Sequence, residues 1–205
     1  VNTAGTYTLT ATDLANGCTA AVSATVAIEA GTPVAVAAAP GPITCADPTL
    51  TIGTAGSSSG PNFTYAWAAS GGGNIVSGQN SPTPVVDAPG DYALTITNTA
   101  NGCTATTTVP VSEDTAAPPA DAGPDGLLTC ADPVFSLSAN GGQPGGLAFV
   151  WQTPDGGFSG DPNSAEVNTA QAGTYTLTVT NPQNGCTATD TAVVSADQIP
   201  PDVAL

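Results

Sequence analysis

The sequence lacks every basic side chain: its 205 residues include no lysine, no arginine and no histidine. With 16 Asp and Glu residues the formal charge is −16, although only 8% of residues are charged, against about 25% in an average soluble domain. Binding to nucleic acid or to an anionic membrane surface depends on Lys and Arg, so both are excluded. Catalysis by histidine, lysine or arginine is excluded on the same ground.

Long apolar runs are also absent. The longest one lies between Pro33 and Pro40, far short of the about 20 residues that a membrane-spanning helix needs, so we expect no membrane insertion. We expect no signal peptide either, because the first residues include no cationic segment. Disorder is disfavoured, since the low charge is combined with 40% hydrophobic residues.

One motif recurs three times, as GTYTLTATDLANGCTA, GDYALTITNTANGCTA and GTYTLTVTNPQNGCTA. Its cysteines are Cys18, Cys103 and Cys186, with spacings of 85 and 83 positions. A second motif, T-C-A-D-P, contains Cys45 and Cys130, which are again 85 positions apart. Independent motifs that agree on one period indicate tandem repeats of about 84 residues.

The period divides the chain into four parts. Residues 1–29 form the C-terminal part of a preceding repeat, 30–112 and 113–197 form two full repeats, and 198–205 begin a following one. We therefore expect a window from a longer array, in which neighbouring repeats are the first partners. Pro-rich segments between the repeats predict semi-rigid joints.

Alternation within each repeat is typical of strands. Tyr7 and Leu9 share one face of a segment whose other face is Thr, and Tyr175 and Leu177 repeat this arrangement. Period two with β-branched residues on one face predicts half-buried antiparallel strands. The Asn-Gly that follows predicts a tight hairpin. Several short strands and turns in about 84 residues predict an all-β fold, made of tandem immunoglobulin-like β-sandwich repeats.

Aromatic residues at fixed places in the repeat are the candidate core. The segment DAPGDYALT resembles the D-x-G-x-Y motif of the immunoglobulin F strand, whose Tyr bonds to upstream backbone. We expect this role for Tyr7, Tyr92 and Tyr175, and we expect Trp67 and Trp151 in the core of the opposing strand. The plainer alternative is that all five are core side chains and nothing more.

The odd number of cysteines is explained by the repeat. Each complete repeat has two, which predicts the disulfides Cys45–Cys103 and Cys130–Cys186 and leaves Cys18 with a partner outside the chain. Disulfides imply an oxidising, extracellular compartment. Each bond would clamp the first strand of a repeat to the start of its last strand and so limit extension under load. Free buried thiols are the alternative, while metal binding is disfavoured by the wide spacings and the lack of His.

Candidates for chemistry are few. Asp-Thr-Ala occurs at 114–116 and 190–192; two such motifs supply the carboxylates of aspartic proteases, but these lie at non-equivalent places in the repeat. No carboxylate pair recurs at matching positions, as a glycosidase would need. We predict that the protein is not an enzyme and has no cofactor. Weak Ca²⁺ binding by loop carboxylates is the alternative, and the residues concerned are Asp114, Asp121, Asp125, Asp155 and Asp161.

The whole pattern combines G-x-Y-x-L-x-x-T, N-G-C-T-A, T-C-A-D-P and aromatic-x-Trp. It resembles the tandem Ig-like or PKD-like repeats of large Bacteroidota cell-surface adhesins, such as gliding adhesins and proteins exported by the type IX system. The resemblance implies an extracellular structural or adhesive array that forms a stalk or filament. Asp-(Ser/Thr)-small apolar is similar to the O-glycosylation site of secreted Bacteroidota proteins, which makes Thr115 and Thr191 candidate glycan sites; ordinary turn and strand threonines are the alternative.

A binding function remains as the alternative to a scaffold. Gly-rich loops at 53–60, 71–73 and 141–146 could form an edge that binds carbohydrate or protein. These loops differ between the repeats, whereas a shared ligand would demand shared residues, so the comparison favours a scaffold. Self-assembly into fibres through low-charge, Thr-rich faces is a third interpretation.

Overall fold

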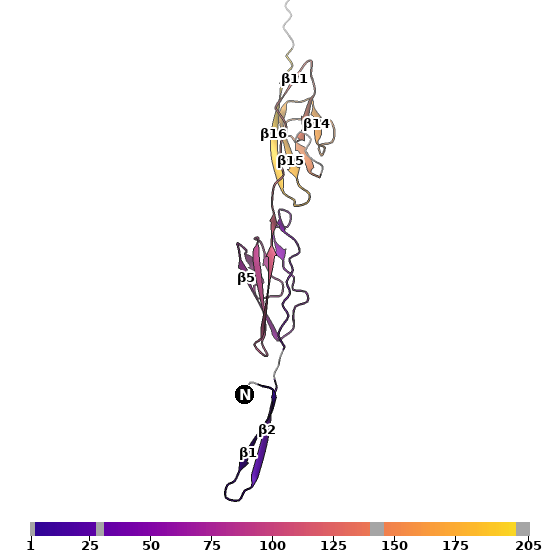
Figure 1. The fold of residues 1–205 in the computed structure, drawn as a ribbon. Coiled ribbons are helices and arrows are strands. Elements are labelled where there is room, and N and C mark those ends of the chain that lie inside the picture. Colours follow the sequence, from indigo (N-terminus) through magenta and orange to yellow (C-terminus); the bar gives the residue numbers. More distant parts are fainter. Residues whose placement is uncertain (1–2, 28–30, 140–145, 200–205) are drawn as a thin grey trace, which may run out of the picture. The chain divides into compact units, whose positions relative to one another are not determined.

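The chain is built from β-strands, as the computed structural model in Figure 1 shows. The structure describes residues 3–27, 31–139 and 146–199. None of these residues forms a helix long and apolar enough to cross a membrane. The elements that these residues form are strands, which confirms the predicted all-β fold.

Contacts within the chain define two compact units, and two of the boundaries between them flank the first T-C-A-D-P motif. The first unit combines Val1–Pro40, Thr51–Val86 and Gly90–Pro110. The second unit combines Gly41–Leu50, Asp87–Pro89 and Val111–Leu205. The first T-C-A-D-P motif, which precedes most of the first unit in sequence, thus belongs to the second unit.

The first unit contains a two-layered sandwich. One sheet has the order β5–β8–β9, where β5 is Phe63–Ser70, β8 is Gly90–Asn98 and β9 is Thr104–Val111. The other has the order β4–β7–β6, where β4 is Leu50–Thr51, β7 is Val85–Val86 and β6 is Ile75–Ser77. Side chains that alternate along β5 and β8 are buried in the core, among them Trp67, Tyr92, Leu94 and Ile96. Their period of two explains why these segments form strands.

The first unit also includes the hairpin of β1 (Gly5–Thr12) and β2 (Thr19–Val26), whose register runs from Gly5↔Val26 to Thr12↔Thr19. Tyr7, which was expected in a core, is 37% exposed, and Leu9 is 69% exposed. The expectation for Tyr7 was wrong because no second sheet among the described residues covers this hairpin.

The second unit repeats the sandwich. One sheet has the order β11–β16–β15–β13, where β11 is Gly126–Thr129, β16 is Thr187–Asp197, β15 is Gly173–Thr180 and β13 is Ala148–Gln152. Facing it are β12 (Phe135–Ser138) and β14 (Glu166–Thr169), paired antiparallel. The core between them includes Leu137, Trp151, Val167, Tyr175 and Leu177. Two short strands, β3 (Ile43–Thr44) and β10 (Glu113–Asp114), pair in parallel in the same unit.

The hairpins β1–β2 and β15–β16 close through a longer loop than the Asn-Gly signal predicted. Strand pairing ends at Thr12↔Thr19 in one and at Thr180↔Thr187 in the other. Each connection thus has six residues, with the Asn-Gly near its end. Gly17 adopts φ 75° and Gly185 adopts φ 71°, left-handed values that favour glycine.

Candidate functional site

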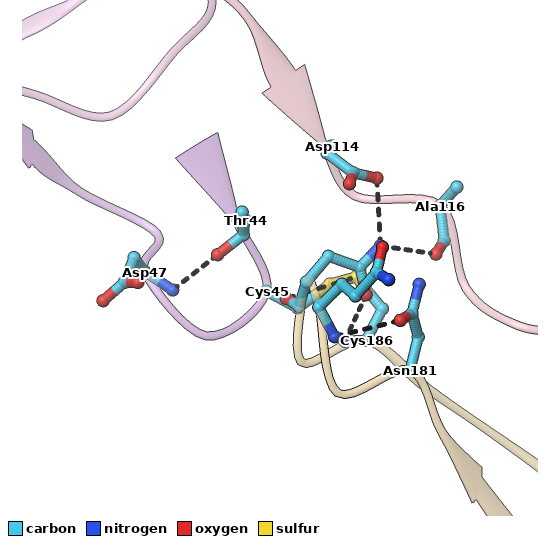
Figure 2. Close-up of a disulfide and its surroundings, with 9 residues drawn as sticks. Thr44, Cys45, Asp47, Asp114, Ala116, Asn181 and Cys186 are labelled. Carbon is cyan, nitrogen blue, oxygen red and sulfur yellow. Dashed lines mark hydrogen bonds between the residues drawn. A yellow bond between two sulfur atoms is a disulfide. The ribbon is translucent and has the colours of Figure 1, made fainter. Parts of the chain in front are cut away.

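The most distinctive site of the molecule is a disulfide bond between Cys45 and Cys186, shown in Figure 2. The two cysteines are 141 positions apart in sequence, and their Cα atoms are 5.0 Å apart. Cys45 comes from a T-C-A-D-P motif and Cys186 from an N-G-C motif. By the sequence period these two motifs belong to successive copies of the repeat, and both cysteines lie in the second compact unit.

The Cys45 side of the bond is a turn that is closed by its own hydrogen bonds. Thr44 N donates to Asp47 O at 3.0 Å, and Asp47 N donates to Thr44 Oγ1 at 2.9 Å. The preceding residue, Ile43, is held by donation of its N–H to Ser112 O at 2.9 Å. The parallel pairing of β3 with β10 therefore fixes where the cysteine points.

The Cys186 side is the six-residue turn between β15 and β16. Gly185 N donates to Asn181 O at 2.8 Å, and Cys186 N donates to Asn184 Oδ1 at 3.0 Å. Asn184 is only 1% exposed. Its Nδ2 donates to Asp114 Oδ1 and to Ala116 O, both at 3.0 Å, so the amide ties this turn to the segment that follows β10.

The two sides make close contact around the bond. Ala46 N donates to Asn184 O at 3.1 Å. A Cβ placed on Gly185 would lie 2.6 Å from Ala46 Cβ, a distance too short for two carbon atoms. Glycine is therefore required here by the approach of the T-C-A-D-P turn as well as by its positive φ.

The predicted pairings Cys45–Cys103 and Cys130–Cys186 were wrong. Strand β11 pairs in parallel with the end of β16, with Thr129 opposite Asp197, whereas Cys186 immediately precedes the first residue of β16. About ten strand residues of about 3.3 Å each therefore separate the two cysteines of a repeat, and a disulfide needs Cα atoms within about 7 Å. The T-C-A-D-P turn that contains Cys130 lies instead beside the C-terminal end of β16.

The remaining cysteines, Cys18, Cys103 and Cys130, are free among the described residues. Cys18 and Cys130 are exposed, while Cys103 is half-buried. The partner expected for Cys18 outside the chain stays a prediction.

The tyrosine of the second unit makes the backbone bond that the resemblance implied. Tyr175 Oη donates to Gln171 O at 2.7 Å and is hydrogen-bonded to the Thr169 hydroxyl. Tyr92 Oη donates to Asn74 O at 3.1 Å. On the exposed hairpin, Tyr7 Oη donates to the backbone oxygen of the residue four positions earlier, at 2.9 Å.

The two tryptophans lie in the cores and differ at their polar atom. Trp67 and Trp151 are each 2% exposed. Trp67 Nε1 donates to Ser81 O at 3.0 Å, whereas Trp151 Nε1 has no partner among the described residues. Their burial explains why an aromatic-x-Trp strand recurs once in each sandwich.

Three carboxylates accept hydrogen bonds within the fold, one from a side-chain amide and two from backbone N–H groups. Asp114 Oδ1 accepts from Asn184, Asp190 Oδ2 accepts from Ala122 N at 2.7 Å, and Asp125 Oδ1 accepts from Val193 N at 2.8 Å. In the part of the chain that the structure describes, no three or more Cys, Asp or Glu residues gather as a metal site. The remaining candidates of the calcium prediction are exposed residues outside the strands: Asp121, Asp155 and Asp161.

Thr115 and Thr191, the candidate glycan sites, are both exposed. Thr191 lies on β16 opposite Thr176 of β15. Glycosylation at either position stays a prediction.

The Gly-rich loops are accounted for in part by packing. A Cβ on Gly73 would lie 2.9 Å from Tyr92 Cζ, so the loop at 71–73 needs glycine to cover this tyrosine. In the loop at 53–60, Gly56 adopts φ 89°, a left-handed value that favours glycine, while a Cβ there would make only an ordinary contact with Val36. Most of the third loop, 141–145, lies outside the described residues.

Sequence reasoning missed the role of the residues beside the cysteines. Asn184 and Ala46 position the disulfide, yet neither was a candidate. The signal was available, because Asn precedes Gly-Cys in all three copies and Ala follows Cys in both T-C-A-D-P motifs.

No protein-family model matches the sequence, and no curated protein matches it. Among solved structures, the chain is similar to a PKD domain in solution, at 22% identity over 45% of this chain and 99% of that one, with a TM-score of 0.33. It is also similar to an I-band fragment of titin, at 14% identity over 82% of this chain and 64% of that one, with a TM-score of 0.37. Three domains of the outer capsid protein Hoc of bacteriophage RB49 match at 15% identity over 80% of this chain and 59% of that one, with a TM-score of 0.45. The strand orders and the buried core of each sandwich define the chain as tandem Ig-like β-sandwiches.

Proposed function

We propose that this chain is part of an extracellular structural array in which disulfide bonds join each repeat to the next. The observation that carries the proposal is the Cys45–Cys186 bond, which links motifs from two successive repeats. Persistent disulfides are typical of oxidising compartments, which supports an extracellular location. The resemblance of the motifs supports a surface adhesin of a bacterium, with the array acting as a stalk or filament that spaces and displays other parts.

The composition supports the same role. With no Lys, Arg or His, the units have no ion pairs between side chains, so apolar cores, strand ladders and covalent bonds hold them together. Trypsin-like proteases have no site to cleave in such a chain. Glycans on Thr115 and Thr191, and lateral assembly into fibres, are extensions of this proposal that rest on the sequence.

The covalent bond gives the array a defined mechanical behaviour. A load applied to the two ends passes through the sulfur atoms and bypasses the residues between Cys45 and Cys186. In an array with this bond at every junction, successive loops overlap. Between one disulfide and the next, the load would then be carried by the segment from an N-G-C cysteine to the following T-C-A-D-P cysteine. This segment is 27 positions long, as between Cys103 and Cys130.

Single-molecule pulling of the chain tests the proposal. The bond closes a loop of 141 positions, which at about 3.5 Å per residue corresponds to about 500 Å of extended chain. We expect the oxidised chain to unfold to a contour length shorter by that amount than the reduced chain. The control is the double variant Cys45→Ser with Cys186→Ser, which should extend fully with or without reductant. Equal contour lengths for the oxidised and reduced native chain would contradict the proposal.

A further inference from the structure

The N-G-C turn at Cys103 has the same construction as the bonded turn at Cys186. Gly102 N donates to Asn98 O at 2.7 Å, and Cys103 N donates to Asn101 Oδ1 at 2.9 Å. Asn101 Nδ2 donates to Gly31 O at 3.1 Å. Gly31 occupies the same place in its repeat as Ala116, 85 positions later, so this contact matches the one between Asn184 and Ala116.

The difference between the two turns is the space beside the glycine. A Cβ on Gly185 would collide with Ala46, whereas a Cβ on Gly102 would meet no atom of the described residues within 4 Å. As far as residues 3–27, 31–139 and 146–199 go, the place that the T-C-A-D-P turn fills at Cys186 is thus open at Cys103, and the Cys103 thiol is free.

The second T-C-A-D-P turn, at Cys130, has the same form as the turn at Cys45 that is bonded to Cys186. Thr129 N donates to Asp132 O at 3.0 Å, and Asp132 N donates to Thr129 Oγ1 at 3.0 Å, as in the turn at Cys45. Cys130 is exposed and free. The form of this turn is therefore set by the motif itself and does not depend on the disulfide.

We propose that the N-G-C turn at Cys103 is a docking site for a T-C-A-D-P turn of another repeat of this kind, sealed by a disulfide. The inference rests on the proposed function, since it assumes that the kind of bond formed at Cys186 recurs at the N-G-C turns of other repeats. The docked turn would place its Ala on Gly102 and donate its Ala N–H to Asn101 O, as Ala46 does at Gly185 and Asn184.

Sealing the site is a balanced thiol–disulfide exchange with a small-molecule disulfide such as oxidised glutathione. The thiolate of the T-C-A-D-P cysteine attacks the small disulfide and releases one glutathione thiolate. The Cys103 thiolate then attacks the protein sulfur of this mixed disulfide and displaces the second glutathione. Two protein thiols lose two protons and two electrons, and the small disulfide is reduced to two thiols.

The turn at Cys18 supplies a matched control. Cys18 N donates to Asn16 Oδ1 at 2.9 Å and Gly17 N donates to Asp13 O at 2.7 Å, so the turn itself is the same. Cys18 is exposed, however, and the Asn16 amide has no acceptor among the described residues. The site at Cys18 lacks the linker contact that the site at Cys103 has.

The test uses the full chain and a peptide with the sequence of residues 41–50, activated at its cysteine as a mixed disulfide with a chromogenic thiol. The capture rates at Cys103 and Cys18 are measured by mass spectrometry and divided by the rates for a small neutral disulfide, which corrects for exposure. We expect this normalised rate to be at least about tenfold higher at Cys103, equivalent to about 1.4 kcal/mol of recognition. A peptide with Ala46→Trp, whose side chain cannot fit over Gly102, should lose the preference.

Two results would overturn the inference: equal normalised rates at Cys103 and Cys18, or an undiminished preference with the Ala46→Trp peptide. Cys103→Ser should abolish capture at this turn and leave capture at Cys18 unchanged. Because the Cys45–Cys186 bond takes no part in the experiment, failure here leaves the pulling result, and with it the proposed function, intact.

Discussion

Hairpin β1–β2 and the pair β15–β16 have first strands of nearly the same sequence but opposite burial. They begin GTYTLTAT and GTYTLTVT, and their registers match position by position. Yet Leu9 is 69% exposed, whereas Leu177 is fully buried. The difference teaches that the local sequence specifies strands, turn and register, while burial requires the other sheet of the repeat.

The cysteines at the ends of these hairpins show the same dependence. Cys186 is bonded and Cys18 is free and exposed, although the two turns have the same internal hydrogen bonds. What distinguishes them is the T-C-A-D-P turn that lies against Cys186. A junction therefore needs parts from two successive repeats, and the following substitutions separate the contribution of each part.

Removal of the disulfide should have the largest effect. In the chain-entropy model a loop of 141 positions contributes up to about 5 kcal/mol to the free energy of unfolding. Cys45→Ser with Cys186→Ser should lower the stability of the second unit by about 3 to 5 kcal/mol, as urea denaturation followed by Trp151 fluorescence in a Trp67→Phe background would measure. Cys18→Ser should change it by less than about 0.5 kcal/mol. A loss of similar size for Cys18→Ser would break the comparison.

Truncation of the equivalent leucines should come next. Leu177→Ala leaves a cavity in the core of the second unit and should cost about 2 to 5 kcal/mol. Leu9→Ala removes an exposed side chain and should cost less than about 0.5 kcal/mol. Thermal denaturation of both variants checks this, and similar shifts would mean that a core covers the first hairpin after all.

The glycines of the N-G-C turns isolate the docking contact. Gly102→Ala has free space but a φ of 73°, so only backbone strain of about 1 kcal/mol is expected. Gly185→Ala adds a collision with Ala46, and we expect a total cost of about 2 to 4 kcal/mol. The fraction of Cys45–Cys186 bond formed on oxidative refolding should fall only for Gly185→Ala. Equal yields would show that the contact with Ala46 has no part in forming the bond.

The tyrosine hydroxyls should give the smallest difference. Tyr175→Phe removes the two hydrogen bonds of its buried hydroxyl, to Thr169 Oγ1 and to Gln171 O, at a cost of about 1 to 2 kcal/mol. Tyr7→Phe removes a bond that water can replace, so its effect should be below about 0.5 kcal/mol. Chemical denaturation of the two variants would measure the difference, and a Tyr175→Phe value as small as that of Tyr7→Phe would contradict it.

The sequence was sufficient to predict the strands, the repeat and the sandwich, because period two and the recurring motifs are local signals. It was not sufficient for the disulfide. Counting two cysteines per repeat led to Cys130–Cys186, but β11 runs parallel to β16 and places these residues at opposite ends of that strand. Parallel pairing between the first and last strands leaves no mark in the residues themselves. The exposure of Tyr7 was missed for a similar reason, since the residues around it are the same as those around the buried Tyr175.

The central claim is that the disulfide joins successive repeats, and its most direct test is a map of the native bonds. Trypsin has no site in this chain, but cleavage before Asp and after Glu places every cysteine on its own peptide: 13–29, 30–46, 91–113, 125–131 and 167–189. Non-reducing mass spectrometry should find 30–46 bonded to 167–189, which is the Cys45–Cys186 pair. Finding 30–46 bonded to 91–113, together with 125–131 bonded to 167–189, would contradict the claim and confine each bond to a single repeat.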